Sequence, residues 1–395
     1  MNFHINGKNV KIIFNYNNYS KRKYRNDFKD FLDYHTKREE KDPEQVRQFD
    51  LKRIFYKEFQ TIPYKGLAAY LSERYSYEFF MKTANYFFIK ILEKVLNDYP
   101  KIITSEEFEI QVQVIRIVRR EYYGAYDPEP SDKDHAYIEF NAVWVLNNIV
   151  MPWALYKKIN YQLIYKFLVH ELYHHVDNIA EAFIYEDKLE DKLKLKSKKI
   201  SNYGVLFLFS VLFELRAEGF AEFASRNSNR FEINKNKILE FKKNLWILVT
   251  KRKKADAEYF FNKKLSTESY ATYYSGNLMC FIIALFFCKN VTNQPKIIFD
   301  GKEFPIIDLN RLIDTKKTVS IMGMPREIYQ KTLSYVNSIG PAEFLNMYNH
   351  ACDHLEISYD NRVLWWKEFI KLKKKTTEIY EADRLKKVIK KGYTI

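Results

Sequence analysis

The sequence at residues 168–175 is Leu-Val-His-Glu-Leu-Tyr-His-His, which contains the pattern His-Glu-x-x-His. Positions four apart share one face of an α-helix, so His170 and His174 can reach a single metal ion. Two neutral imidazoles are typical zinc ligands, and Glu171 can take a proton from an attacking water. Apolar residues recur at helical spacing from 155 to 176, which predicts the helix that the pattern requires.

Three glutamates are candidates for a third ligand. Glu214, Glu218 and Glu222 are four residues apart in a very apolar segment, which is predicted to be a helix over about 204–225. Burying a carboxylate in such a helix is costly unless the carboxylate is paired or bound to a metal. We therefore expect one of the three to complete a His-His-Glu site whose fourth position stays open.

Residues 218–223, Glu-Gly-Phe-Ala-Glu-Phe, resemble the Asn-Glu-Gly-Phe-Ala segment of aminopeptidase N-like gluzincins, which are zinc metallopeptidases of the MA clan. The resemblance implies that Glu218 binds zinc and that Glu222 orients a ligating histidine, as an acid of thermolysin-like enzymes does. A second alignment, with the E-x-x-A-[DN]-x-F-A string of ImmA/IrrE-type peptidases, shifts the ligand to Glu214. We prefer Glu218, with Glu214 and Glu222 as supporting acids, and the choice between Glu218 and Glu214 stays open.

Two further segments are similar to this family. Residues 273–276, Tyr-Tyr-Ser-Gly, resemble a Y-x-x-G element, which implies that Tyr273 donates a hydrogen bond to the oxyanion of the transition state. Residues 124–127, followed by a predicted strand over 136–146, resemble the edge strand before the zinc helix of zincins, which binds an extended peptide. The expected substrate strand includes Ile138, Glu139, Phe140 and Asn141.

The resemblance implies an α+β, predominantly helical fold with a zincin-like catalytic domain, made of a small mixed sheet and the active-site helices. Helical spacing predicts a helix over 77–98. Strict alternation of apolar and polar residues over 109–119 predicts a strand, and Pro152 is suited to open one long helix that reaches Asp177.

We expect three parts in the chain. Residues 1–105 form an N-terminal, mainly helical section, and residues 106–290 form the catalytic domain, with a charged insertion at 178–202. Residues 291–395 form a C-terminal, mainly helical section.

The chain also departs from aminopeptidases. His174 and Glu218 are 44 positions apart, which the charged insertion explains, and the G-[AG]-M-E-N string that holds a free amine is absent. Glu139 lies at about the right distance, but its flanking residues do not match. Aminopeptidase activity is therefore not supported. His350 and His354 are four apart on a helix that starts at Pro341, and whether they bind a second metal stays open.

Composition narrows the class of protein. Hydrophobic residues make up 47% of the chain, which excludes a disordered protein, and no apolar run is long enough to cross a membrane. Three cysteines without C-x-x-C spacing and an N-terminus without a secretory signal favour a cytoplasmic setting. The net charge of +15 permits nucleic-acid binding, but no known motif accompanies it, so this partner is not favoured.

The sequence therefore predicts a zinc metallopeptidase that holds one Zn²⁺ and acts on a peptide or protein substrate. Its metal ligands are His170, His174 and Glu218, and its catalytic residues are Glu171 and Tyr273. The alternative is a basic nucleic-acid- or protein-binding protein with a catalytically silent zincin core. A third, minor hypothesis is a zinc hydrolase that acts on a non-peptide amide or ester.

Overall fold

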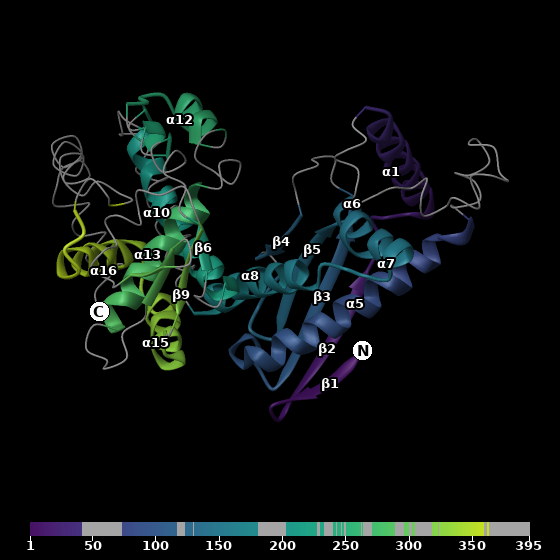
Figure 1. Ribbon diagram of the computed structural model, residues 1–395, viewed down its shortest axis with the longest axis horizontal. Helices are drawn as coiled ribbons and strands as arrows, with labels where there is room; N and C mark the ends of the chain where they lie inside the picture. Colours follow the sequence, from purple (N-terminus) through teal and green to yellow (C-terminus); the bar gives the residue numbers. More distant parts are fainter. Residues whose placement is uncertain are drawn as a thin grey trace. The chain divides into compact units, whose positions relative to one another are not determined.

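The computed structural model describes most of the chain in two compact units, Met1–His175 and Val176–Ile395. The boundary falls inside helix α8, Tyr161–Ile179 (Figure 1). Helix predominates in the described part, which also contains a small mixed five-stranded sheet, so the fold is α+β. The described residues are 1–41, 73–116, 123–128, 130–180, 203–226, 230–232, 240–263 except 242, 246, 249 and 262, 271–288, 296–299, 302–304, 318–322, 324–358 and 362.

The first unit contains the five-stranded sheet, with strand order β1-β2-β3-β5-β4. Strands β2, β3 and β5 are parallel to one another, while β1 and β4 pair antiparallel to their neighbours. The strands span Asn2–Ile5, Lys8–Asn15, Glu107–Ile115, Gly124–Asp127 and His135–Asn141, from β1 to β5. The predicted strand over 109–119 is thus β3, which ends at Ile115, and residues 117–122 lie outside the described part.

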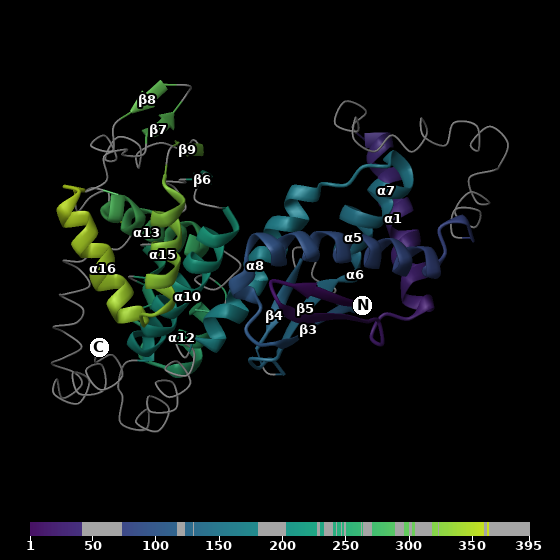
Figure 2. The same cartoon turned by 90° about the horizontal axis from the view of Figure 1, so that it is seen from below.

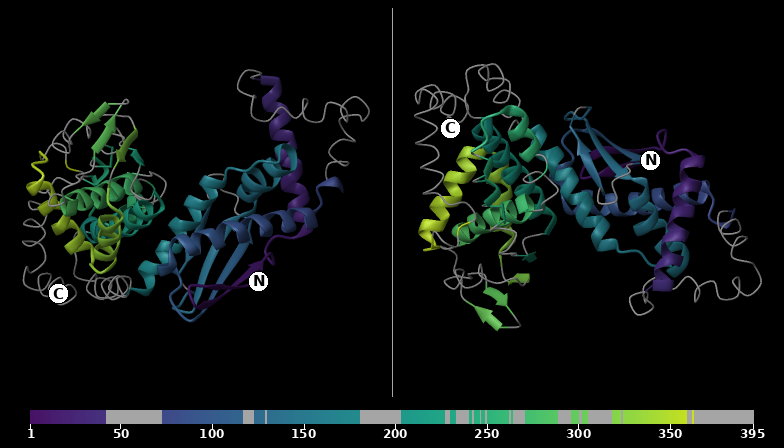
Figure 3. Two further views of the ribbon diagram at one scale, coloured as in Figure 1. Left: turned by 60° about the horizontal axis from the view of Figure 1, so that its bottom comes forward. Right: turned by 90° about the horizontal axis from the view of Figure 1, so that it is seen from above.

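Two helices pack on one face of this sheet. Helix α5, Tyr77–Asp98, confirms the helix predicted from the spacing of its apolar residues, and the Ser76 hydroxyl caps its first turn. The ring of Phe140 on β5 contacts both Phe88 on α5, at 4.4 Å between centroids, and Phe167 on α8, at 5.1 Å. Figure 3 shows α5 lying along the sheet. The apolar side of α8 therefore rests on the sheet that carries β4.

Short helical segments connect β5 to α8. They are α6 (Ala142–Val145), the π-helical segment η3 (Leu146–Val150) and α7 (Met151–Tyr156). The first unit also contains α1 (Lys21–Lys41) and the 3₁₀ segment η2 (Pro100–Ile102).

The prediction of one helix from Pro152 to Asp177 is wrong. Helix α7 ends where Lys157 adopts a left-handed conformation with φ of 54°, and its N–H bonds to the Trp153 carbonyl. A new helix then begins at Tyr161, where the Asn160 side chain accepts from the backbone N–H of Leu163. The His-Glu-x-x-His motif lies in this separate helix, α8.

The second unit is mainly helical. Helix α13 packs against α10, α15 and α16 (Figure 2), and α10 also contacts α12. These helices span Tyr203–Arg226 (α10), Lys254–Phe260 (α12), Ala271–Cys288 (α13), Arg326–Asn337 (α15) and Pro341–His354 (α16). An antiparallel sheet of order β6-β9-β7-β8 is formed by Arg230–Glu232, Thr318–Met322, Lys296–Phe299 and Lys302–Phe304.

Helix α10 confirms the helix predicted over 204–225. Residues 181–202 of the predicted charged insertion lie outside the described part. Across the described ranges, none of the helices combines the length and the apolar character that a membrane span requires.

Helices α10 and α13 cross at two glycines. A Cβ atom added to Gly219 would lie 2.7 Å from the Cα of Gly276, and the reverse distance is also 2.7 Å. Contacts this short are not tolerated between backbones, because neither helix can move a flexible side chain out of the way. Both glycines are therefore required for the two helices to approach this closely.

We predict that Gly276→Ala destabilises the protein although alanine favours a helix. The gain in helix propensity is about 1 kcal/mol, and overpacking two backbones costs more, so the net loss should be about 2 kcal/mol. Urea unfolding followed by circular dichroism measures it. Gly7→Ala is the control, because Gly7 has open space and a φ of 80°, and it should cost only about 1 kcal/mol. Equal losses in the two variants would contradict the crossing argument.

Candidate metal centre

The motif side chains occupy a largely buried part of α8. His170 is 8% exposed and Glu171 is 7% exposed, while His174 is half-buried. Their neighbours Leu168, Val169 and Leu172 are fully buried, which fixes the rotation of the helix about its axis. Burial of the His170 imidazole and the Glu171 carboxylate on one helix is costly unless these groups have partners.

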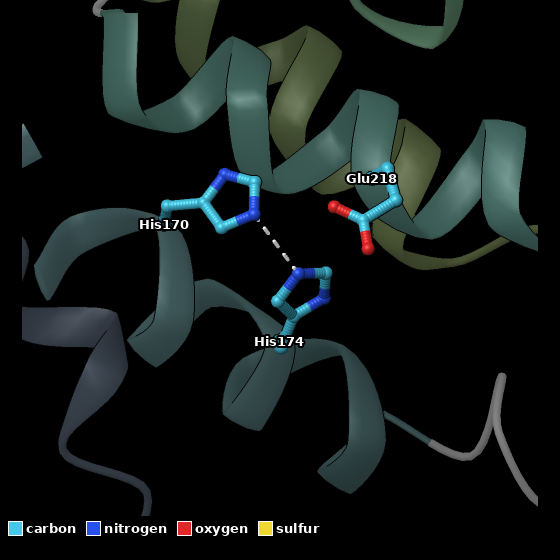
Figure 4. A group of neighbouring side chains, drawn as sticks. All are labelled: His170, His174 and Glu218. Carbon is cyan, nitrogen blue, oxygen red and sulfur yellow. Dashed lines mark hydrogen bonds between the residues drawn. The ribbon is translucent and has the colours of Figure 1, made fainter. Parts of the chain in front are cut away.

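The two histidines and Glu218 form a group that could hold a metal ion. His170 Nε2 lies 3.2 Å from His174 Nε2, and one ligand atom from each of the three residues lies within 4.8 Å of the others (Figure 4). Tetrahedral zinc with Zn–N distances of ~2.0–2.1 Å places two imidazole nitrogens about 3.3 Å apart. The separation of the two histidine nitrogens is thus compatible with a shared metal and also with a hydrogen bond between the two rings. Glu214 is not a member of this group.

Glu171 is held by the edge of the sheet. Its Oε2 accepts a hydrogen bond of 2.8 Å from the backbone N–H of Tyr126, which lies on β4. This bond uses a main-chain donor that would otherwise face outward from the last strand of the sheet. The carboxylate that the sequence predicts as a general base is therefore positioned beside β4.

The predicted substrate strand is wrong in one respect. Strand β5, which contains Ile138, Glu139, Phe140 and Asn141, lies between β3 and β4 and pairs with both. Its backbone cannot add a further strand. Among the described strands, the edge beside α8 is β4, at Gly124–Asp127. The predicted strand also ends at Asn141, whose side chain accepts from the Val143 N–H and starts α6.

The structure describes the positions of the two supporting acids, Glu222 and Glu214, and of the predicted tyrosine, Tyr273. Glu222 is buried and forms an ion pair with Arg226, four residues later on α10, and Ser225 donates to its backbone carbonyl. Glu214 is half-buried. Tyr273 is half-buried in the first turn of α13, three residues before Gly276 at the helix crossing.

The two histidine rings of α16 pack edge-on against one phenylalanine ring. The ring of Phe286 on α13 lies 5.1 Å from that of His350 and 5.0 Å from that of His354. Within the described part of the chain, this pair belongs to no group of three residues that could hold a metal. Its observed contacts are those of an aromatic cluster.

His175 belongs to the surroundings of the site and is fully buried. Its Nε2 lies 3.1 Å from Thr104 Oγ1, and its Nδ1 lies 3.4 Å from the hydroxyl of Tyr126. Burial lowers the pKa of His175 to about 4, so the ring is neutral near neutral pH. Sequence reasoning did not identify Thr104, which belongs to no motif, and it placed Tyr126 only within the 124–127 segment, because Tyr126 reaches Glu171 through its backbone.

A buried ion pair holds α10 against the end of α8 in the second unit. Both terminal nitrogens of Arg216 donate to the carboxylate of Asp177 at 2.7 Å. Arg216 also donates to two backbone carbonyls at the end of α15, those of Val336 and Ile339. Both charged side chains are at most 3% exposed, so their desolvation is offset only by these bonds.

Comparison of the chain with protein-family models, with curated proteins and with solved structures finds no match. The assignment of a function therefore depends on the residues and their geometry.

We predict that Arg216→Met lowers the free energy of unfolding by about 3–5 kcal/mol, because it leaves the Asp177 carboxylate buried without its cation. Urea unfolding measures the loss. Replacing both partners, as Arg216→Met with Asp177→Leu, should recover a large part of it. The exposed pair Lys11–Glu109 supplies the control, since Lys11→Ala should cost less than about 1 kcal/mol. A loss for Arg216→Met as small as that of the control would show that the pair does not hold the helices.

Proposed function

We propose that the protein is a zinc-dependent metallopeptidase of the gluzincin type. The observation that carries the proposal is the convergence of ligand atoms from His170, His174 and Glu218 within 4.8 Å, with Glu171 next to the first histidine. Two imidazoles and one carboxylate are the ligand set of a catalytic zinc site with an open fourth position. Calcium and magnesium prefer oxygen ligands, so zinc fits this set better.

The proposed roles follow from the chemistry of each side chain. His170, His174 and Glu218 would hold Zn²⁺, which when bound would polarise a water molecule and the carbonyl group of the substrate. Glu171 takes a proton from the attacking water and delivers it to the leaving amine. By resemblance, Tyr273 donates a hydrogen bond to the oxyanion. The products are two shorter peptides, one with a new carboxyl group and one with a new amino group.

The sheet edge supports a peptide as the substrate. Strand β4 lies at the edge, antiparallel to β5, and its Tyr126 N–H contacts Glu171. An extended peptide that pairs with β4 would run directly beside the proposed base. This is the zincin-like arrangement that the sequence resemblance implies, with the substrate strand shifted from β5 to β4.

Glu171→Gln should abolish hydrolysis and leave zinc in place. Glutamine cannot accept the proton, so turnover of fluorogenic casein should fall by about 10²–10⁴-fold. Metal content measured by mass spectrometry should stay at the value of the parent protein, because Glu171 is not a ligand. Full activity in this variant would refute the mechanism.

Glu218→Ala should lose the zinc ion that the parent protein binds, whereas Glu214→Ala should keep it. The two glutamates are four residues apart on α10, and Glu218 alone joins the histidines among the described residues. Zinc titration with a chromogenic chelator as competitor compares the two affinities. If Glu214→Ala loses the ion and Glu218→Ala retains it, the third ligand is Glu214. Equal affinity in both variants and in His174→Ala would argue against a metal site here and favour a silent core.

A further inference from the structure

Tyr126 forms one hydrogen bond through its backbone and another through its side chain. Its backbone N–H donates to Glu171 Oε2 at 2.8 Å, and its phenol oxygen lies 3.4 Å from His175 Nδ1. On the other side of the imidazole, His175 Nε2 lies 3.1 Å from Thr104 Oγ1, and the Thr104 hydroxyl donates to the Lys133 carbonyl at 2.5 Å. The chain thus links β4, α8, the segment after η2 and the β4–β5 loop within the first unit.

The direction of this chain follows from its last acceptor. The Lys133 carbonyl can only accept, so Thr104 uses its one hydroxyl hydrogen there. Thr104 Oγ1 must then accept from His175, which places the imidazole proton on Nε2. Nδ1 carries no proton and accepts from the Tyr126 hydroxyl. Each donor and acceptor has one defined role.

Burial makes this arrangement rigid. His175 is 0% exposed and Tyr126 is 9% exposed, and the ring of Phe108 lies 5.4 Å from the imidazole. A buried polar atom that loses its partner bears its full desolvation cost, so the buried Tyr126–His175 bond is not exchanged readily for water. Strand β4 pairs with β5 on one side, and among the described strands none pairs with its other side.

We propose that the Tyr126–His175 hydrogen bond, with Thr104 setting the tautomer of the imidazole, is a clamp that positions Glu171. It holds β4 against α8, so that the Tyr126 N–H fixes one oxygen of the carboxylate. His175 and Tyr126 are thus positioning residues for the hydrolysis, and this role rests on the proposed function. The clamp itself is a property of the fold that can be tested without any activity.

Two substitutions of His175 distinguish a role of its hydrogen bonds from a role in filling the core. In His175→Asn, the side-chain oxygen takes the place of Nδ1 and keeps an acceptor for Tyr126. In His175→Gln, the amide nitrogen takes the place of Nε2 and keeps a donor for Thr104, but the acceptor is lost. Tyr126→Phe removes the phenol directly. Tyr16→Phe is the matched control, since it removes a phenol bond of the same unit, to Asn85 at 2.6 Å.

The first readout is amide hydrogen exchange of Tyr126, followed by NMR on the full-length, zinc-free chain. We expect exchange to be about tenfold faster in Tyr126→Phe and His175→Gln, and close to the parent rate in His175→Asn and Tyr16→Phe. Equal rates in His175→Asn and His175→Gln, or an unchanged rate in Tyr126→Phe, would overturn the clamp.

The second readout is hydrolysis of fluorogenic casein by the zinc-loaded variants. A positioning role predicts that kcat falls about tenfold in Tyr126→Phe and His175→Gln, with KM and zinc content unchanged and recovery in His175→Asn. If the parent protein neither binds zinc nor cleaves casein, the proposed function fails, and the exchange experiment still decides the clamp. If the parent is active and the exchange pattern is absent, the clamp alone fails.

Discussion

The buried ion pair between Arg216 and Asp177 is the constraint that fixes the end of α8 against α10 within the second unit. Asp177 follows His174 by three residues, which is about 4.5 Å along the axis of α8. Arg216 precedes Glu218 by two residues on α10. Because a helix is stiff over one turn, the pair restrains the last turn of α8 as well as Asp177 itself. A buried charge pair is tolerated only with near-complete hydrogen bonding, and the backbone carbonyls of Val336 and Ile339 accept the remaining hydrogen bonds of Arg216.

Two of the segments that resemble gluzincins, residues 218–223 and 273–276, each contain a glycine, and both glycines have a structural explanation. Gly219 and Gly276 are required where α10 and α13 cross, whatever the protein does. The parts of the strings that carry functional information are therefore the polar residues beside them. Under the proposed function, Glu218 and Tyr273 are the residues of these strings that carry the chemistry.

The sequence predicts where helices and strands form better than it predicts which of them lie side by side. Apolar spacing identified α5 and α10, and the His-Glu-x-x-His pattern identified the pair of histidines that converge on one point. The break at Lys157 escaped prediction, because apolar residues keep helical spacing on both sides of it and a single left-handed residue leaves no periodic signal. Glu214 and Glu218 share one helix face, so only tertiary packing distinguishes them.

The edge strand was misplaced for a different reason. Alternation shows which side chains face the core, but it contains no information on which strand lies beside which. The order β3-β5-β4 arises because the chain turns back between β4 and β5. The partner of Glu171 is a backbone N–H, which every residue except proline has, so no residue type in the sequence could reveal it.

The Tyr126–Glu171 hydrogen bond matters both for the unpaired edge of β4 and for the proposed reaction. An edge strand presents outward-facing donors that attract other chains, and here a carboxylate from α8 satisfies one of them. A peptide that pairs with β4 therefore meets this carboxylate at Tyr126 and at no other position of the four-residue strand. Under the proposed function, this places the bond to be cleaved opposite Tyr126. The same hydrogen bond thus satisfies an outward-facing donor of the edge and, under the proposed function, determines where on that edge a substrate reacts.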